Sequence, residues 1–155
     1  MKPFLLSLRF LAAFLLTSGF SSPLLQAQAA EQKAVDPSGE WQCNWTSTSG
    51  YYFTGLVTLT AKDDGTLSGR IIWTMKKSPR QEEQSKLDLS GTEFIRGTYD
   101  FKTRLVLLEG FRKDDPSSVI GLDRYKLIFA DNGASLGGLT ENHGLWSAFF
   151  FAVRK

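Results

Sequence analysis

Hydrophobic and polar residues alternate with period two along most of the chain after residue 40, and this alternation predicts β-strands. The pattern is clearest in residues 125–154, where three extended segments are separated by turns at 131–133 and 141–144. Both turns contain Asn and Gly, which tolerate the positive φ angles of tight hairpin turns. This closing region therefore predicts an antiparallel meander.

The same pattern recurs upstream and gives about eight strands in total. The further predicted strands are residues 41–48, 51–60, 67–75, 92–101 and 104–111, and Ile120 is a candidate start for the strand that contains Tyr125. Between them, residues 76–90 are charged and contain Pro79, so we expect either a loop or one short helix there. No convincing amphipathic helix interrupts the strands.

The predicted fold is all-β, a single antiparallel up-and-down barrel of about eight strands without a C-terminal helix. Two packed sheets are the alternative for a meander of this length. Closure is favoured because it leaves no exposed sheet edge. Glycines within the strand patterns also favour it, since they permit the sharp coiling of a small barrel: Gly55, Gly69, Gly97, Gly110 and Gly138.

The first 29 residues have the pattern of a cleaved signal peptide. Lys2 precedes an apolar stretch over residues 4–20, and small residues at Ala27 and Ala29 suit signal peptidase. Arg9 divides the apolar stretch and leaves too short a run for a retained membrane anchor. We therefore expect a cleaved leader at 1–29, a lead-in at 30–38 and a barrel domain at 39–155. The protein would be exported, periplasmic or extracellular, with no membrane anchor after cleavage.

Removal of the leader cancels the net charge. The full chain has 18 basic and 16 acidic residues, and loss of Lys2 and Arg9 leaves 16 of each. Nucleic acid is therefore not an expected partner, because phosphate binding needs a surplus of Lys and Arg. Cys43 is the single cysteine, so no disulfide forms within the chain and stability must come from the core.

The sequence does not predict an enzyme, a catalytic residue, a metal site or a cofactor. The single histidine, His143, lies in a predicted turn, and zinc needs three or four His, Cys or carboxylate ligands. Glu109 shares a strand face with Leu105 and Leu107, so it is either a buried acid needing a partner or, in the opposite register, a surface residue. Both faces of this predicted strand are apolar, so the two registers of Glu109 stay open. The same holds for the last strand at Phe149–Phe151, where an oligomer contact is possible.

Gly39-Glu40-Trp41 at the start of the first strand, with Arg154 at the end of the last, resembles the signature of the calycin superfamily of lipocalins, fatty-acid-binding proteins and avidins. The resemblance implies a lipocalin-like barrel in which Trp41 packs across the closed end and Arg154 covers its indole. It assigns Gly39, Trp41 and Arg154 to structural closure. Asp123-Arg124-Tyr125 matches the lipocalin T-D-x-Y motif in part, and the long C-terminal helix of classical lipocalins is missing.

Two functions follow from this fold. In the first, the barrel binds a small apolar or aromatic molecule in a pocket lined by Tyr51, Phe53, Trp73, Tyr99, Phe101 and Tyr125, although the same aromatic residues could fill the barrel. In the second, a filled barrel inhibits a secreted hydrolase, a peptidase or a lysozyme, through residues 76–90 and 113–118. Trp41 near Cys43 resembles one group of secreted peptidase inhibitors, which normally contains a disulfide that this chain cannot form.

Overall fold

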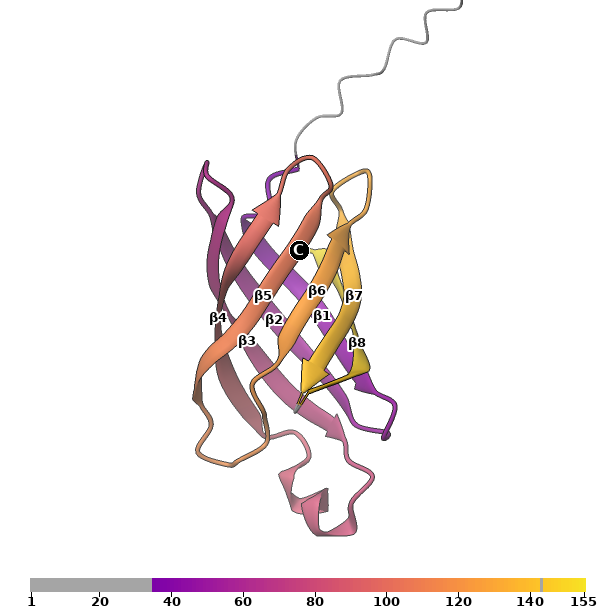
Figure 1. Ribbon diagram of the computed structural model, residues 1–155. Coiled ribbons are helices and arrows are strands. Elements are labelled where there is room, and N and C mark those ends of the chain that lie inside the picture. Colours follow the sequence, from indigo (N-terminus) through magenta and orange to yellow (C-terminus); the bar gives the residue numbers. More distant parts are fainter. Residues whose placement is uncertain (1–34, 143) are drawn as a thin grey trace, which may run out of the picture. The chain divides into compact units, whose positions relative to one another are not determined.

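A computed structural model of the protein describes residues 35–142 and 144–155, and it shows a closed barrel (Figure 1). The predicted leader at 1–29 lies outside the described residues, as does the first part of the lead-in. The barrel consists of eight strands and one 3₁₀-helix: β1 (Gly39–Ser47), β2 (Tyr52–Ala61), β3 (Thr66–Lys77), η1 (Gln81–Lys86), β4 (Ser90–Asp100), β5 (Leu105–Asp114), β6 (Arg124–Phe129), β7 (Ser135–Asn142) and β8 (Leu145–Arg154).

Each strand pairs antiparallel with the next, and β8 pairs with β1 to close the sheet. The closing register runs from Trp41 opposite Arg154 to Ser47 opposite Ala148. The predicted fold class is therefore confirmed, and within the described residues β8 is the last element. Within the described part of the chain, no helix has the length and apolar character needed to cross a membrane.

Alternating residues of all eight strands point into the barrel and form one core. Glycine is required where two strands approach closely: a Cβ at Gly97 of β4 would overlap the main-chain oxygen of Leu107 in β5. Aromatic side chains contact one another along the interior, with ring centroids 5.4 Å apart for Trp41 and Phe129 and 6.0 Å apart for Trp73 and Phe150. Large side chains thus occupy much of the barrel.

The structure settles the register around Glu109. Val106 and Leu108 point inward, and Glu109 points outward, where its Oε1 lies 2.7 Å from Nε of Arg96. Phe111 is the extra residue of a β-bulge, since Ile95 pairs with Gly110 and Phe94 pairs with Arg112. The buried-acid alternative for Glu109 is therefore wrong.

In β8, Phe150 is buried and its two neighbours are exposed. Phe149 pairs with Leu139, and Phe151 packs over Gly137, so apolar side chains adjoin one another on the outer face of β7 and β8. An oligomer contact through this face stays a prediction.

Two residues, Trp146 and Ile120, depart from what strand alternation alone predicts. Trp146 lies two and four residues before the inward residues Ala148 and Phe150, so alternation would turn it inward, but it is 48% exposed. Thr140 pairs with Ala148 while Glu141 pairs with Trp146, so the extra residue Ser147 reverses the alternation. Ile120 does not begin a strand; it lies in the loop before β6, where the charged side chain of Asp115 accepts its N–H at 3.0 Å.

One end of the barrel is sealed around Trp41, whose side chain is fully buried. The indole N–H donates to the Pro37 carbonyl at 3.2 Å, and the Arg154 guanidinium lies 4.2 Å from the ring centroid. Arg154 also donates to the Ser38 carbonyl at 2.8 Å and to the Asp36 carbonyl at 2.5 Å. This contact is the one that the calycin resemblance implies for Trp41 and Arg154.

Candidate functional site

The opposite end of the barrel carries a small cavity. This end holds the β1–β2 turn, the β3–β4 connection with η1, and the β5–β6 loop, all seen in the lower part of Figure 1. The cavity has a volume of about 60 Å³. Pockets for drug-sized ligands measure roughly 300–1,000 Å³, so this mouth cavity has room for a few water molecules or for a small chemical group.

Four aromatic side chains from four strands line the mouth cavity: Trp45 of β1, Phe53 of β2, Trp73 of β3 and Tyr125 of β6. They are held by edge contacts, with ring centroids 5.6 Å apart for Trp45 and Phe53 and 6.4 Å apart for Phe53 and Trp73. Strand alternation turns each of these residues inward, and the stagger of the strands brings the four to the same level of the barrel.

Glu93 of β4 is the central polar group of the cavity, and its side chain is only 1% exposed. Its Oε2 accepts hydrogen bonds from the Trp73 indole at 3.0 Å and from the Tyr125 hydroxyl at 2.5 Å, and its Oε1 accepts from the Asp123 N–H at 3.0 Å. Burial raises the pKa of Glu93 to about 7, although the three donors oppose that change. The carboxyl group can therefore gain or lose a proton near neutral pH.

Asp123 places a second carboxyl group beside the first. Its Oδ2 accepts from the Trp45 indole at 2.9 Å and from the Thr140 hydroxyl at 3.3 Å, and its Oδ1 accepts from the Asn142 amide at 2.5 Å. Negative charge on Asp123 is one of the causes that raise the pKa of Glu93. Two neighbouring buried acids thus face a cavity with aromatic walls.

Burial also raises the pKa of two further side chains near Glu93, Tyr125 and Cys43. The Tyr125 hydroxyl has its pKa raised well above the usual range, first by burial and then by the charge of Glu93. The Cys43 thiol has its pKa raised for the same two reasons. Both side chains therefore stay neutral at physiological pH, and Cys43 is an inert core residue.

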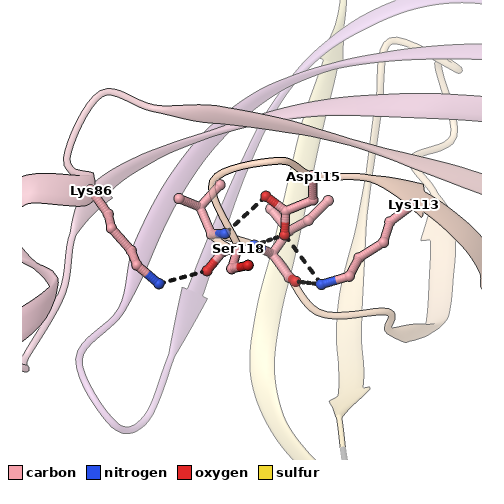
Figure 2. A network of polar contacts seen from close by, with 6 residues as sticks. Lys86, Lys113, Asp115 and Ser118 are labelled. Carbon is pink, nitrogen blue, oxygen red and sulfur yellow. Dashed lines mark hydrogen bonds and ion pairs between the residues drawn. The ribbon is translucent and has the colours of Figure 1, made fainter.

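The β5–β6 loop supplies Ile120, Gly121 and Asp123 to the cavity, and it is anchored by its own polar contacts (Figure 2). Asp115 accepts the Val119 N–H at 2.9 Å and the Ile120 N–H at 3.0 Å. Lys113 donates to the Ile120 carbonyl at 2.5 Å and forms an ion pair with Asp115 at 3.2 Å. These contacts fix the loop conformation that carries the cavity wall.

The same loop is tied to the segment that contains η1. The amino group of Lys86, at the end of η1, donates to the Ser118 carbonyl at 2.8 Å, as Figure 2 shows. Residues 76–90 and 113–118, which the sequence singles out as two separate candidate contact segments, therefore adjoin each other at the mouth of the barrel.

Two glycines make room for the polar groups. A Cβ at Gly110 of β5 would overlap the Glu93 carboxylate, and a Cβ at Gly121 would lie 2.5 Å from the Asn142 amide nitrogen. The bare backbone of β5 therefore allows an acid to lie inside the barrel at this level.

Among the six predicted pocket residues, Phe53, Trp73 and Tyr125 line the mouth cavity. Tyr51 is half-buried in the β1–β2 turn and packs against the core without lining the cavity. Tyr99 and Phe101 lie at the sealed end: Tyr99 contacts Phe129 at 5.4 Å between ring centroids, and Phe101 lies in the β4–β5 turn with its side chain 41% exposed. The structure thus brings half of the predicted set together.

Sequence reasoning missed Glu93, Asp123 and Trp45 as cavity residues. Alternation does place Glu93 on the same strand face as Ile95 and Tyr99, so the sequence pattern could have predicted that this acid points into the barrel. Asp123 and Asn142 had no such signal, because the first lies in an irregular loop and the second ends a strand beside a bulge. Within residues 35–142 and 144–155 no group of three or more His, Cys, Asp or Glu residues is arranged to hold a metal ion.

No protein-family model and no curated protein matches the chain. Among solved structures, the barrel is similar to one described as the de novo design of a fluorescence-activating β-barrel. The two chains are 12% identical, the match covers 80% of this chain and 98% of that chain, and the TM-score is 0.51. At this identity the likeness concerns the fold alone.

Proposed function

We propose that the protein is an exported, non-enzymatic barrel that binds a small ligand in the mouth cavity. The observation that carries the proposal is the composition of that cavity, in which Trp45, Phe53 and Trp73 surround the buried carboxyl group of Glu93. Small-molecule sites typically combine apolar walls with a few polar groups that fix the ligand. Buried acids are costly in a core, and such exceptions concentrate at functional sites.

The position of the cavity also supports the proposal. It lies at the end opposite the sealed Trp41–Arg154 end, beside the β1–β2 turn, the β3–β4 connection and the β5–β6 loop. The barrel wall is continuous, because β8 pairs with β1, so the connections at the mouth can vary without loss of the sheet. Export is supported by the leader pattern of residues 1–29.

The decisive experiment is native mass spectrometry of the mature protein, purified from the secreted or periplasmic fraction of its own host. We expect an added mass that disappears on denaturation, together with an N-terminus near residue 30. Gly121→Leu should displace Asn142 and lower the fraction of protein that carries the added mass. Leu122→Phe, at the next and exposed position, should leave this fraction unchanged. A bare chain mass from several growth conditions would count against ligand binding.

Inhibition of a secreted hydrolase is the second candidate function. One observation favours it: the Lys86–Ser118 hydrogen bond joins residues 76–90 and 113–118 into one composite surface at the mouth. Deletion of residues 81–84 should then leave the barrel folded and abolish inhibition of a peptidase or lysozyme. Inhibition that survives the deletion would exclude this segment.

A further inference from the structure

The charge of the mouth cavity is unusual for an apolar site. Two carboxyl groups, Glu93 and Asp123, are among its lining residues, and within the described part of the chain no Lys or Arg lines it. Lys113 pairs with Glu93 in the β4–β5 ladder, but its amino group binds Asp115 and the Ile120 carbonyl instead. Among residues 35–142 and 144–155, an ionised Glu93 therefore has no cationic side chain beside it.

Glu93 meets only neutral donors among the described residues: an indole N–H, a phenol O–H and a backbone N–H. An ionised carboxylate offers about four acceptor sites, so three hydrogen bonds leave capacity for one more donor. A buried carboxylate without a counter-ion is unstable relative to its protonated form. A ligand that supplies both a positive charge and an N–H donor would complete the site.

The walls indicate what the rest of that ligand is made of. Trp45, Phe53 and Trp73 present carbon surface rather than further oxygen ligands, and aromatic rings attract organic cations, most strongly where water is excluded. A metal ion would need additional oxygen or nitrogen ligands that these side chains do not offer. Carbon groups bound to a cationic nitrogen suit the aromatic walls.

We propose that the mouth cavity binds a small organic ammonium ion, with Glu93 as its counter-ion and Trp45, Phe53 and Trp73 enclosing its carbon groups. This inference rests on the proposed function and names the ligand class of the same site. The cavity volume of about 60 Å³ suits an ammonium group with a short alkyl substituent, and larger parts of a ligand would extend through the mouth.

Ligand binding is then linked to proton release. The pKa of Glu93 is raised to about 7, mainly by burial, and a bound ammonium ion favours the ionised form. Among the described residues, the other titratable groups that face Glu93 are Asp123, Tyr125 and Cys43, and the last two stay neutral. Affinity for the cation should therefore fall as the pH decreases below about 7.

Isothermal titration with isobutylammonium and isobutanol tests the ligand class, because the two probes share a carbon skeleton and differ in charge. At pH 8 we expect isobutylammonium to bind at least tenfold more tightly than isobutanol. Glu93→Gln should remove this preference. Glu109→Gln, the same substitution on the outer face, should retain it.

Equal binding of the two probes, or a preference that survives Glu93→Gln, would overturn the ammonium inference and leave ligand binding intact. Binding of neither probe also overturns it, and native mass spectrometry then judges the proposed function separately. If Glu93→Gln does not fold, the wild-type pH profile decides. We expect the affinity for isobutylammonium to fall by up to about tenfold per pH unit below pH 7, and a flat profile from pH 5 to 8 would contradict the inference.

Discussion

Trp41 and Trp45 both point inward from β1, but they lie at opposite ends of the barrel and their indole N–H groups have different partners. The Trp41 N–H donates to a main-chain carbonyl, and the ring is covered by the Arg154 guanidinium. The Trp45 N–H donates to the Asp123 carboxyl group and to the Thr140 hydroxyl, beside a cavity. One end is closed by a main-chain hydrogen bond and a cation–ring contact, whereas the other holds two buried acids beside a cavity.

The largest expected effect is at the sealed end. Trp41→Ala should lower the free energy of unfolding by about 3–5 kcal/mol, because it removes a fully buried aromatic side chain and leaves a cavity under Arg154. Trp45→Ala should cost less, since Trp45 is only partly buried. Denaturant unfolding of both variants checks this difference, and equal losses would break the contrast between the two ends.

The mouth should carry a pH dependence near neutrality, whereas at the sealed end the pKa of Asp36 is lowered by hydrogen bonds from Ser38, so that this group titrates in the acid range. The pKa of Glu93 is raised from 4.5 in the unfolded chain to about 7, so the folded barrel holds the proton more tightly. Its stabilising contribution is fully present below pH 4.5 and is lost as the pH rises through about 7. The loss amounts to about 3 kcal/mol, at roughly 1.4 kcal/mol per pKa unit.

Unfolding of the wild type and of Glu93→Gln between pH 4 and 8 measures that contribution. The stability of the wild type should fall across this range by about 3 kcal/mol more than that of the variant. Parallel profiles for the two proteins would show that Glu93 ionises in the barrel as it does in the unfolded chain.

The smallest expected changes in stability come from substitutions at two buried tyrosines. Tyr125 donates its hydroxyl to Glu93, so Tyr125→Phe should cost about 1–3 kcal/mol and raise the pKa of Glu93 further. The buried Tyr99 hydroxyl has no hydrogen-bond partner in the described structure, so Tyr99→Phe should be neutral or stabilising by up to about 1 kcal/mol. Thermal unfolding of the pair checks this, and a larger loss at Tyr99 would reverse the comparison.

Much of the fold could be predicted because period-two alternation and turn residues are local signals. They gave eight strands in the right order, and the strand glycines indicated closure. The registers of Glu109 and Trp146 could not be predicted in this way. The register of Glu109 depended on which of two apolar strand faces turned inward. The orientation of Trp146 was reversed by the β-bulge at Ser147.

The site was less predictable than the fold, because its residues come from distant parts of the chain. Aromatic residues on inward faces gave Phe53, Trp73 and Tyr125, but the same criterion selected Tyr99 and Phe101 at the sealed end. Alternation could place Glu93 inside, yet its hydrogen bond with the Asp123 N–H joins residues 30 positions apart, one of them in an irregular loop. Position along the barrel axis depends on strand stagger, which no local pattern shows.

Pairing of β1 with β8 has a consequence for how the barrel forms. Each of the other strand pairs joins antiparallel neighbours in sequence, so it can form as a hairpin on its own. The seam between β1 and β8 instead links Ser38 to Arg154, which are 116 residues apart. Such long-range contacts make folding slow, on a scale of milliseconds to seconds, so closure of the seam should be the late step. A chain held open before that step keeps its inward faces exposed and remains accessible to chaperones.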